Sequence, residues 1–344
     1  MTRIPESIED YPVRQWTLGE YPWLGADEYF SPATRVIIDN DFAGDPDDLY
    51  QLVHHLLCPS VEIPLIVASH LRKGDPFDDS DESAHHAYVV ARDVFARMGI
   101  TNSEIIVEGA NSAIPDTHTP HDNPAVRAII AEALRDDTDL PLFYAAGGGL
   151  TDLASALLIA PEIASRMTLL WIGGLEHDGL AYPPPNPMPI EYNLLIDVAA
   201  GQVVFDADGL EIWQAPRDIY RQCLVSQAEL RMRVKNRGAL GAYLFDALHH
   251  EGQRVHRRGT LATETYALGD SPLVLFTALR SLFEPDPASS DYVSKPTPEL
   301  TSNGTYRPRT TSRPMRVYTQ VDTRLMFEDM FLKIDEFVRW SESI

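Results

Sequence analysis

The chain has 344 residues and a formal net charge of −23, because its 51 Asp and Glu residues far outnumber its 28 Lys and Arg residues. This excess of acid argues against a nucleic-acid partner, since phosphate binding requires clustered basic side chains, and two cysteines are too few for a disulfide framework or a cysteine-based zinc site. The sequence has neither the apolar run of a signal peptide near its N-terminus nor an apolar segment long enough to cross a membrane, so we expect a soluble cytoplasmic protein without a membrane partner.

After an irregular N-terminal arm at 1–34, strand-like and helix-like segments alternate along the chain. The predicted strands lie at 35–39, 63–69, 104–108, 141–146, 168–173 and 316–320. The first predicted helix begins at Pro46, with Asp45 as its N-cap. Later predicted helices span about 82–98 and 123–135, begin near 151 and 197, fill most of 225–283, and begin again near 323. This alternation is typical of a Rossmann-like α/β fold with a mostly parallel sheet and helices on both faces. We therefore expect residues 35–344 to form a single α/β domain.

Three irregular segments interrupt the alternation as loop insertions. Residues 72–82 are acidic, residues 175–190 are rich in proline, and residues 284–315 are rich in Pro, Ser and Thr. Long loops in a compact domain often act as lids or binding loops, although plain insertions are as common. The proline-rich loop adds Asn186 to the candidates for substrate binding.

The most informative stretch follows the first predicted strand. Its five aspartates lie within ten residues, at positions 39, 41, 45, 47 and 48. A solvated acidic turn that caps the following helix would explain Asp45 and one neighbour, with Pro46 at the first helical position, but not all five. Ligands of open α/β sheets bind at the carboxyl ends of strands. The cluster therefore indicates a hard divalent cation held by oxygen ligands.

Three later stretches also carry polar side chains or glycines at the ends of predicted strands. Gly147 opens a glycine-rich turn that lets the backbone approach a ligand closely, but it lacks the Gly-Lys-Ser/Thr ending of a phosphate loop. Glu191 and Asn193 occupy alternate positions from which a carboxylate and an amide could bind a polyol. Asp270 precedes a proline and could cap a helix. Taken singly, each stretch is better explained as a structural feature: a turn, a strand edge or a cap.

In this order and spacing, the four stretches resemble the inosine–uridine-preferring nucleoside hydrolase family. The family's Asp-x-Asp-Pro-Gly-x-Asp-Asp loop looks like Asp39-Asn-Asp-Phe-Ala-Gly-Asp-Pro-Asp-Asp48, which has two extra residues. Its Gly-Pro-Leu-Thr-Asn turn looks like Gly148-Gly-Leu-Thr-Asp152, and its Met-Gly-Gly strand end looks like Ile172-Gly-Gly174. Its Glu-Phe-Asn-x-x-x-Asp-x-x-Ala-Ala stretch looks like Glu191-Tyr-Asn-Leu-Leu-Ile-Asp-Val-Ala-Ala200. Its late His-Asp-Pro helix start looks like Gly269-Asp-Ser-Pro272. The resemblance covers about residues 35–283 and extends to the last predicted strand and helix.

The resemblance implies a calcium-dependent hydrolase that releases the base from a ribonucleoside. The implied Ca²⁺ ligands are Asp41, Asp48, the main-chain oxygen of Thr151, and Asp270. Ligation by oxygen alone fits calcium better than zinc. Asp41 is also the implied base, deprotonating a metal-bound water that attacks the anomeric carbon with inversion. The family resemblance further implies a homo-oligomer, a dimer or a tetramer.

The same resemblance implies how the sugar is bound. Asp47 would hold a ribose hydroxyl, and Glu191 and Asn193 would bind the sugar. The two extra residues in the aspartate loop leave Asp45 as an alternative to Asp47.

The departures from the family pattern concern the leaving base, which normally needs a proton donor. The family's histidine before the late aspartate is Gly269 here, and its Gly-Asn pair after the second strand is Ser69-His70. His70 is therefore the first candidate for the donor. The other possibilities are that the donor is absent or is one of Tyr266, His249, His250 and His177.

Two other functions remain compatible with the sequence. A haloacid-dehalogenase-type phosphohydrolase also opens with an apolar strand and Asp-x-Asp, which Asp39-Asn-Asp41 matches, and it uses Mg²⁺ with an aspartyl nucleophile. A calcium-dependent ribose-binding protein would have lost catalysis together with the histidine that Gly269 replaces.

Overall fold

The central feature of the fold is an eight-stranded sheet. The computed structural model describes residues 4–5, 7–25, 27–28, 30–257, 263–281 and 289–342. In spatial order the sheet contains β3 (Ile106–Glu108), β2 (Val61–Ala68), β1 (Thr34–Asn40), β4 (Leu142–Ala146), β5 (Met167–Ile172), β6 (Glu211–Ala215), β12 (Pro314–Gln320) and β9 (Asp291–Pro296). Neighbouring strands are parallel except β9, which runs antiparallel to β12. The predicted Rossmann-like, mostly parallel sheet is therefore confirmed.

Two small antiparallel pairs lie outside this sheet. One joins β10 (Glu299–Leu300) to β11 (Tyr306–Arg307), and the other joins β7 (Leu224–Ser226) to β8 (Thr265–Ala267).

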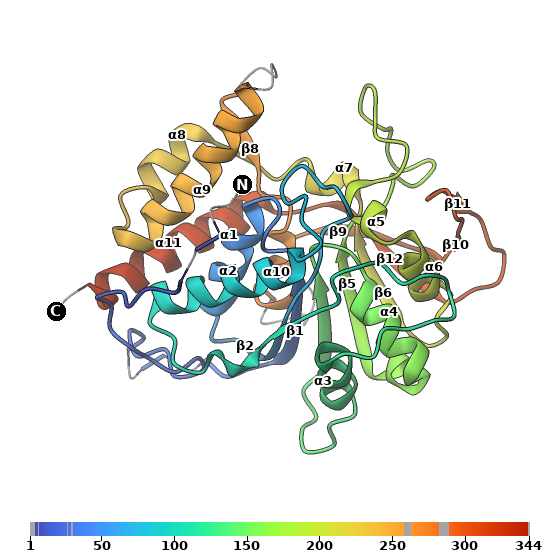
Figure 1. The fold of residues 1–344 in the computed structure, drawn as a ribbon, viewed down its shortest axis with the longest axis horizontal. Coiled ribbons are helices and arrows are strands. Elements are labelled where there is room, and N and C mark those ends of the chain that lie inside the picture. Colours follow the sequence, from blue (N-terminus) through green and yellow to red (C-terminus); the bar gives the residue numbers. More distant parts are fainter. Residues whose placement is uncertain are drawn as a thin grey trace.

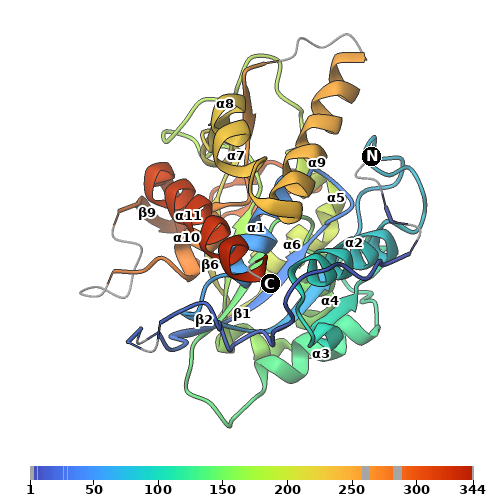
Figure 2. The same ribbon diagram turned by 90° about the vertical axis from the view of Figure 1, so that its left-hand side faces the viewer.

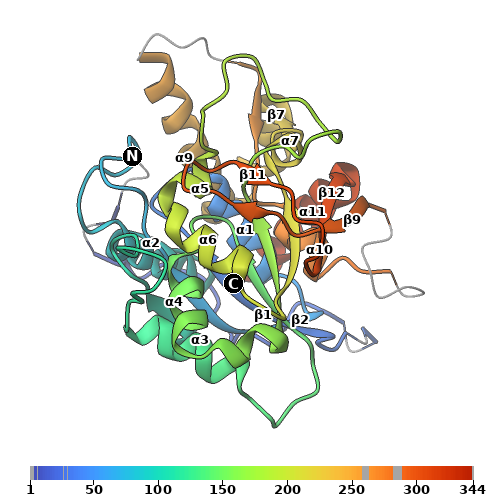
Figure 3. The same ribbon diagram turned by 90° about the vertical axis from the view of Figure 1, so that its right-hand side faces the viewer.

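Helices cover both faces of the large sheet (Figure 1). One layer contains α1 (Asp47–Leu56), α2 (Ser83–Met98), α9 (Gly238–Arg257), α10 (Pro272–Thr277) and α11 (Thr323–Ser341), and Figure 2 looks onto this side. The other layer contains α3 (Pro124–Ala133), α4 (Thr151–Ile159) and α6 (Val198–Asp206), which Figure 3 faces. The shorter helical segments are α5 (Tyr192–Ile196), α7 (Arg217–Tyr220), α8 (Gln227–Glu229), the 3₁₀ turns Ser103–Ile105 and Pro161–Arg166, and the π-helical turn Leu230–Val234.

The covered faces explain why the central strands read as continuous apolar runs. Strands β1 and β4 are buried along their whole length, as expected for parallel strands between two helical layers. Successive side chains of β1 enter different cores, because Val36 and Ile38 pack on the side of α1 and α2, whereas Ile37 packs on the side of α3 and α4. No helix among the described residues has the length and apolar character needed to cross a membrane.

The strand order reverses between β1 and β4. The chain runs outward from β1 through β2 to β3 and then returns to the other side of β1 as β4. Ligands of such sheets bind at the carboxyl ends of the strands beside this reversal. The aspartate loop follows β1 and the glycine-rich turn follows β4, so the topology brings these two predicted site elements together.

Two strands of the large sheet were not predicted from the sequence. β6 contains a buried glutamine, Gln214, and an exposed Glu211, so it lacks an apolar run. β9 lies inside the segment 284–315 that was predicted to be irregular. Helix α1 begins at Asp47, one residue later than the predicted start at Pro46.

The described part of the N-terminal arm packs against helices far along the chain. The Trp16 amide donates to the Gly99 carbonyl at 2.9 Å. The Trp16 ring lies 6.2 Å from the Phe337 ring of α11. This packing ties the arm to the same face of the sheet as α2 and α11.

Candidate active site

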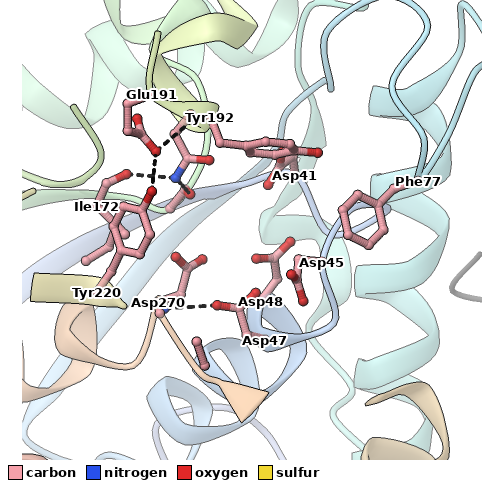
Figure 4. A pocket seen from close by; sticks show the side chains of 14 residues that line it. Asp41, Asp45, Asp47, Asp48, Phe77, Ile172, Glu191, Tyr192, Tyr220 and Asp270 are labelled. Atoms are coloured by element: carbon pink, nitrogen blue, oxygen red, sulfur yellow. Dashed lines mark hydrogen bonds between the residues drawn. The ribbon is translucent and has the colours of Figure 1, made fainter. Parts of the chain in front are cut away.

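A cavity opens at the carboxyl ends of β1, β4 and β5 (Figure 4). The residues that line it are Asp41, Asp45, Asp47, Asp48, Phe77, Gly147, Ile172, Glu191, Tyr192, Asn193, Tyr220, Ala267, Gly269 and Asp270. Ten of them come from the aspartate loop, the glycine-rich turn, the Glu191 stretch and the late Asp270 stretch, and the other four are Phe77, Ile172, Tyr220 and Ala267. All four sequence segments that we singled out therefore meet here.

Aspartates that lie far apart in the sequence form a compact group. Asp47, Asp48 and Asp270 are buried, and each offers an oxygen atom within 4.8 Å of the others. The side-chain amide of Asn40 donates to the Asp270 carboxylate at 2.6 Å, and the Asp270 main-chain N–H donates to Asp47 Oδ2 at 3.2 Å. These bonds hold the late aspartate against the loop after β1.

Burial and mutual repulsion raise the pKa values of this group. Burial, followed by repulsion from Asp41 and Asp270, raises the pKa of Asp48 well above its usual range. The pKa of Asp41 is raised for the same reasons, burial first and then the charge of Asp270. Burial raises the pKa of Asp270 to about 6. Packing these carboxyl groups together is therefore unfavourable unless a positive charge lies among them.

The donor set fits a hard divalent cation. Asp48 Oδ2 is buried and has no hydrogen-bond partner among the described residues. This oxygen could therefore coordinate a cation. The three residues that meet offer oxygen only, which is the ligand type that Ca²⁺ and Mg²⁺ prefer. A second cluster of possible metal ligands contains His54, Cys58 and Asp329. The ammonium of Lys333 occupies it, contacting Cys58 Sγ at 3.1 Å and Asp329 at 2.6 Å.

The glycine-rich turn is required by the close approach of its backbone to the aspartates. A Cβ atom at position 147 would overlap the carboxylate of Asp270 and the amide of Asn40. A Cβ atom at position 148 would lie 3.1 Å from Asp41 Cγ. Glycine therefore permits β4 to end directly beside the acidic group.

Glu191 caps helix α5 rather than lying in a strand. Its two carboxylate oxygens accept the main-chain N–H groups of Asn193, at 3.2 Å, and Leu194, at 3.1 Å. Glu191 also accepts the Gly174 N–H at 2.7 Å and the Tyr220 hydroxyl at 2.8 Å. Four donors thus fix this carboxylate at the cavity wall. The strand-edge alternative for this stretch is wrong, because the Glu-x-Asn spacing belongs to a helix start.

Asn193 is fixed equally firmly. Its amide nitrogen donates to the carbonyl oxygens of Gly147 at 2.5 Å and Ile172 at 2.8 Å. Both amide hydrogens are used in these bonds, so the group that Asn193 can still offer a ligand is its carbonyl oxygen.

Aromatic side chains form the part of the cavity around Asp45. The rings of Phe77 and Tyr192 lie 6.5 Å apart and nearly perpendicular to each other. Asp45 accepts the hydroxyl of Tyr266 at 2.5 Å. Burial raises the pKa of Asp45 to about 6, although the hydrogen bond from Tyr266 opposes this shift. Asp45 and Asp47 both line the cavity, so the geometry brings both candidate sugar-binding aspartates to the site.

Asp39 is the one member of the five-aspartate cluster that leaves the group. It is fully buried, does not line the cavity, and accepts a hydrogen bond from the Tyr144 hydroxyl of β4. Asp39 lies inside β1, whereas the other four aspartates follow the end of the strand at Asn40, so Asp39 stays between the two helical layers. Burial raises its pKa to about 7.

His70 is not brought into the cavity. Its ring is buried, with Nε2 2.9 Å from the Thr151 hydroxyl oxygen and Nδ1 2.8 Å from the Leu71 carbonyl oxygen. Burial lowers the pKa of this imidazole. His70 therefore links the loop after β2 to the start of α4, and the expectation of a proton donor facing the substrate does not match this geometry.

Thr151 and Asn186 also lie away from the cavity lining. The main-chain oxygen of Thr151 accepts the hydroxyl of Ser155 at 2.9 Å, within the first turn of α4. This bond uses one of the two lone pairs of that oxygen. Asn186 is exposed on the proline-rich loop, with a positive φ of 52°.

None of the other histidines suggested as donors lines the cavity. His177 is buried against Gln214, with 2.8 Å between the two side chains. His249 and His250 lie on exposed positions of α9. The space above Gly269 is instead bounded by Tyr220, whose Cβ and Cδ2 atoms would lie 3.4 and 3.5 Å from a Cβ at position 269.

The aromatic residues of the cavity were missed by the sequence analysis. Tyr220 follows the unpredicted strand β6, and Phe77 lies in the acidic loop 72–82, where nothing in the local pattern indicates a site. Tyr192 sits within the Glu-Tyr-Asn stretch and is the one that the resemblance could have indicated.

Comparison with known proteins bears on both the family and the fold. A family model described as inosine-uridine preferring nucleoside hydrolase matches residues 36–328. The structure is similar to that of a plant nucleoside hydrolase, at 19% identity and a TM-score of 0.65, over 88% of this chain and 99% of that chain. It is also similar to a purine-preferring ribonucleoside hydrolase from Gardnerella vaginalis, at 17% identity and a TM-score of 0.67, over 89% and 100% of the two chains. A third similar structure is an inosine-uridine preferring nucleoside hydrolase from Bacillus anthracis, at 19% identity and a TM-score of 0.60, over 88% and 99% of the two chains. No match was found among curated proteins.

Proposed function

The chain belongs to the inosine-uridine preferring nucleoside hydrolase family, whose members are glycosidases that hydrolyse N-glycosyl compounds, and from this premise we propose a calcium-dependent N-ribosyl hydrolase in which Asp41 is the catalytic base. The observation that carries the proposal is the meeting of Asp47, Asp48 and Asp270 in the cavity that Glu191 and Asn193 also line. Carboxylates that could hold a cation, next to firmly held groups that could bind a sugar, support hydrolysis of a riboside.

Calcium is the proposed cation, and Asp48, Asp270 and Asp41 are its proposed carboxylate ligands. The unpartnered Asp48 oxygen and the raised pKa values of the group support this assignment. Calcium accepts six to eight oxygen ligands in flexible geometry, which suits carboxylates contributed by two distant loops. When bound, the cation would make a water molecule more acidic and orient it with the sugar hydroxyls.

The role proposed for Asp41 is to accept a proton from the attacking water. Its main-chain N–H donates to the Asn40 side-chain oxygen at 3.0 Å, which fixes the backbone at the end of β1. Its carboxyl group lies against Gly148, so the carboxylate faces the cavity without a covering side chain. As water loses its proton to Asp41, its oxygen forms the new bond to the anomeric carbon and the bond to the base breaks.

Glu191, Asn193 and Asp47 are proposed to hold the ribose. Their carboxylate and amide oxygens are acceptors, which suits the hydroxyl groups of a sugar. The four donors that bind Glu191 keep it in one position, so little conformational freedom would be lost on binding.

The proposal is tested by measuring ribose release from p-nitrophenyl riboside and from a panel of ribonucleosides. We expect release that stops with chelator and returns with Ca²⁺. Asp41→Asn should lower kcat by at least ~10², since general-base contributions typically run to about 10²–10⁴, while Asp79→Asn, at an exposed position, should not change it. Absence of ribose release from every substrate, or activity of Asp41→Asn within about tenfold of the parent, would contradict the proposal.

A further inference from the structure

The two ends of the cavity differ in chemistry. Glu191 and Phe77 lie at opposite ends, with Asp41, Asp45 and Asp48 between them (Figure 4). If Glu191 and the metal-binding aspartates hold the ribose, as proposed above, the base must extend toward Phe77. That end is bounded by the Phe77 and Tyr192 rings and by the carboxylate of Asp45. The chemistry of these groups defines the kind of base that fits.

The hydroxyl and amide donors of the cavity lining are already used within the protein. They belong to Tyr192, Asn193 and Tyr220. The Tyr192 hydroxyl donates to Asp75 at 2.8 Å, and the Tyr220 hydroxyl donates to Glu191 at 2.8 Å. Both amide hydrogens of Asn193 are bonded to carbonyl oxygens. The side chains therefore present acceptors to a ligand.

The Tyr266 hydroxyl beside Asp45 is also used within the protein. Tyr266, which approaches Asp45 from β8, donates its only hydroxyl hydrogen to that carboxylate at 2.5 Å. No free hydroxyl, amide or imidazole of the lining thus remains to protonate a departing base. The position at which the family has a histidine is Gly269, and Tyr220 covers it with its hydroxyl directed at Glu191.

The cavity lining is strongly acidic. Six of the fourteen lining residues are Asp or Glu, and none of the fourteen is Lys, Arg or His. A divalent cation would offset two negative charges and leave the rest. A positively charged side chain, Arg254, lies over the Phe77 ring with Cζ 4.7 Å from the ring centroid. It is paired with Glu251 at 2.5 Å. Phe77 therefore already faces one cation, and Asp45 and Tyr192 remain for a second.

We propose that the substrates of this enzyme are ribosides whose base carries a positive charge, such as N-ribosylpyridinium compounds or N7-alkylated purine ribonucleosides. A cationic aromatic ring is attracted to the face of Tyr192 and to the Asp45 carboxylate. This inference rests on the function proposed above and specifies its substrate class.

The charge of the base also removes the need for a proton donor. Water forms the O–C1′ bond, and the C1′–N bond breaks with its electron pair moving to the ring nitrogen. That electron pair neutralises the positive charge, so the base leaves as a neutral molecule. The proton that water loses passes to Asp41 and then to solvent. A neutral nucleoside would instead release an anion, which requires a donor, and the lining offers no free hydroxyl, amide or imidazole for this role.

The experiment separates charge recognition from leaving-group chemistry. Cleavage of p-nitrophenyl riboside is inhibited competitively with N1-methylnicotinamide, a cation, and with nicotinamide, its neutral counterpart. We expect the cation to bind at least ~10-fold more tightly, a modest figure for one aromatic ring and a carboxylate. Asp45→Asn should reduce this preference at least ~fivefold, whereas Asp79→Asn, an equal charge change at an exposed position, should leave it intact.

A second measurement uses a pair of substrates that differ by one methyl group and one charge. We expect kcat/KM for 7-methylguanosine to exceed that for guanosine by at least ~100-fold. Equal inhibition by the two nicotinamides, no effect of Asp45→Asn on the preference, or guanosine cleaved as fast as its methylated form would overturn the inference. Failure to cleave p-nitrophenyl riboside would instead contradict the proposed function itself, so the two failures are distinguishable.

Discussion

Replacement of Asp48 by Asn is expected to stabilise the metal-free protein and to remove most of the stabilisation that calcium provides. Asp48 presents an oxygen within 4.8 Å of oxygens from Asp47 and Asp270. At that distance and an effective dielectric constant of about 20, two full charges repel by about 3.5 kcal/mol. Protonation relieves much of this repulsion, so we expect the metal-free variant to gain about 1 kcal/mol in free energy of unfolding. An asparagine can also donate a hydrogen bond to Asp270.

The parent protein gains stability from the cation that the variant binds poorly. At a free Ca²⁺ concentration of about 100 times Kd, binding to the folded state contributes about 2.7 kcal/mol. An unfolding entropy of about 2.1 cal/mol/K per residue gives about 0.7 kcal/mol/K for a chain of 344 residues. The expected changes are therefore an increase of about 4 °C in Tm for the parent with calcium, and a Tm about 1.4 °C above the parent for Asp48→Asn in chelator.

Differential scanning calorimetry at pH 7, with chelator and with calcium, measures both changes. Asp79→Asn is the matched control, because it removes the same charge from an exposed position. Mg²⁺ and Zn²⁺ at equal free concentration identify the preferred ion. The reasoning is refuted if calcium leaves the Tm of the parent unchanged, or if it raises the Tm of Asp48→Asn by as much as that of the parent.

Three further predictions concern other residues. His70→Ala should lower the free energy of unfolding by about 2–3 kcal/mol in urea titrations, because it breaks buried hydrogen bonds. The ratio of kcat/KM values for inosine and p-nitrophenyl riboside should stay within about threefold of the ratio in the parent, and a selective loss on inosine would restore His70 as a donor. Gly147→Ala should weaken calcium binding by about tenfold in calorimetric titration, since its Cβ would displace Asp270, and unchanged affinity would show that the overlap is relieved elsewhere. His177→Gln should reduce the acid sensitivity of folding, because burial lowers the pKa of His177 from 6.5 to about 4, against the opposing bond to Gln214. The unfolded chain therefore binds the extra proton, and the free energy of unfolding of the parent falls as the pH drops from 6.5 toward 4, by about 2 kcal/mol between pH 7 and pH 5. Parallel pH profiles of the two proteins would contradict this.

The sequence by itself determined the class of fold and the location of the acidic site along the chain. Alternating apolar runs and amphipathic segments reflect burial of strands between two helical layers, which is a local pattern. The aspartates after β1 and the glycines after β4 could be placed at one edge, because the carboxyl ends of parallel strands lie together. The short strand β6 escaped detection because no local pattern reveals how its buried Gln214 is satisfied. The Gln214 side-chain oxygen is bonded to His177, and its amide nitrogen donates to the Tyr306 hydroxyl oxygen and the Gly173 carbonyl.

Only the tertiary structure decided which side chains face the cavity. His70 and Asp41 both follow central strands, yet the first turns toward Thr151 at the start of α4 and the second toward the cavity. The direction of a side chain at a strand end depends on the packing of both neighbouring layers, which local sequence does not encode. Likewise, Tyr220 covers Gly269 because α7 and the start of α10 meet in space across 49 residues of sequence. The loss of a histidine at position 269 could be read from the sequence, whereas its consequence, a cavity whose hydroxyl and amide donors are all used, required the folded chain.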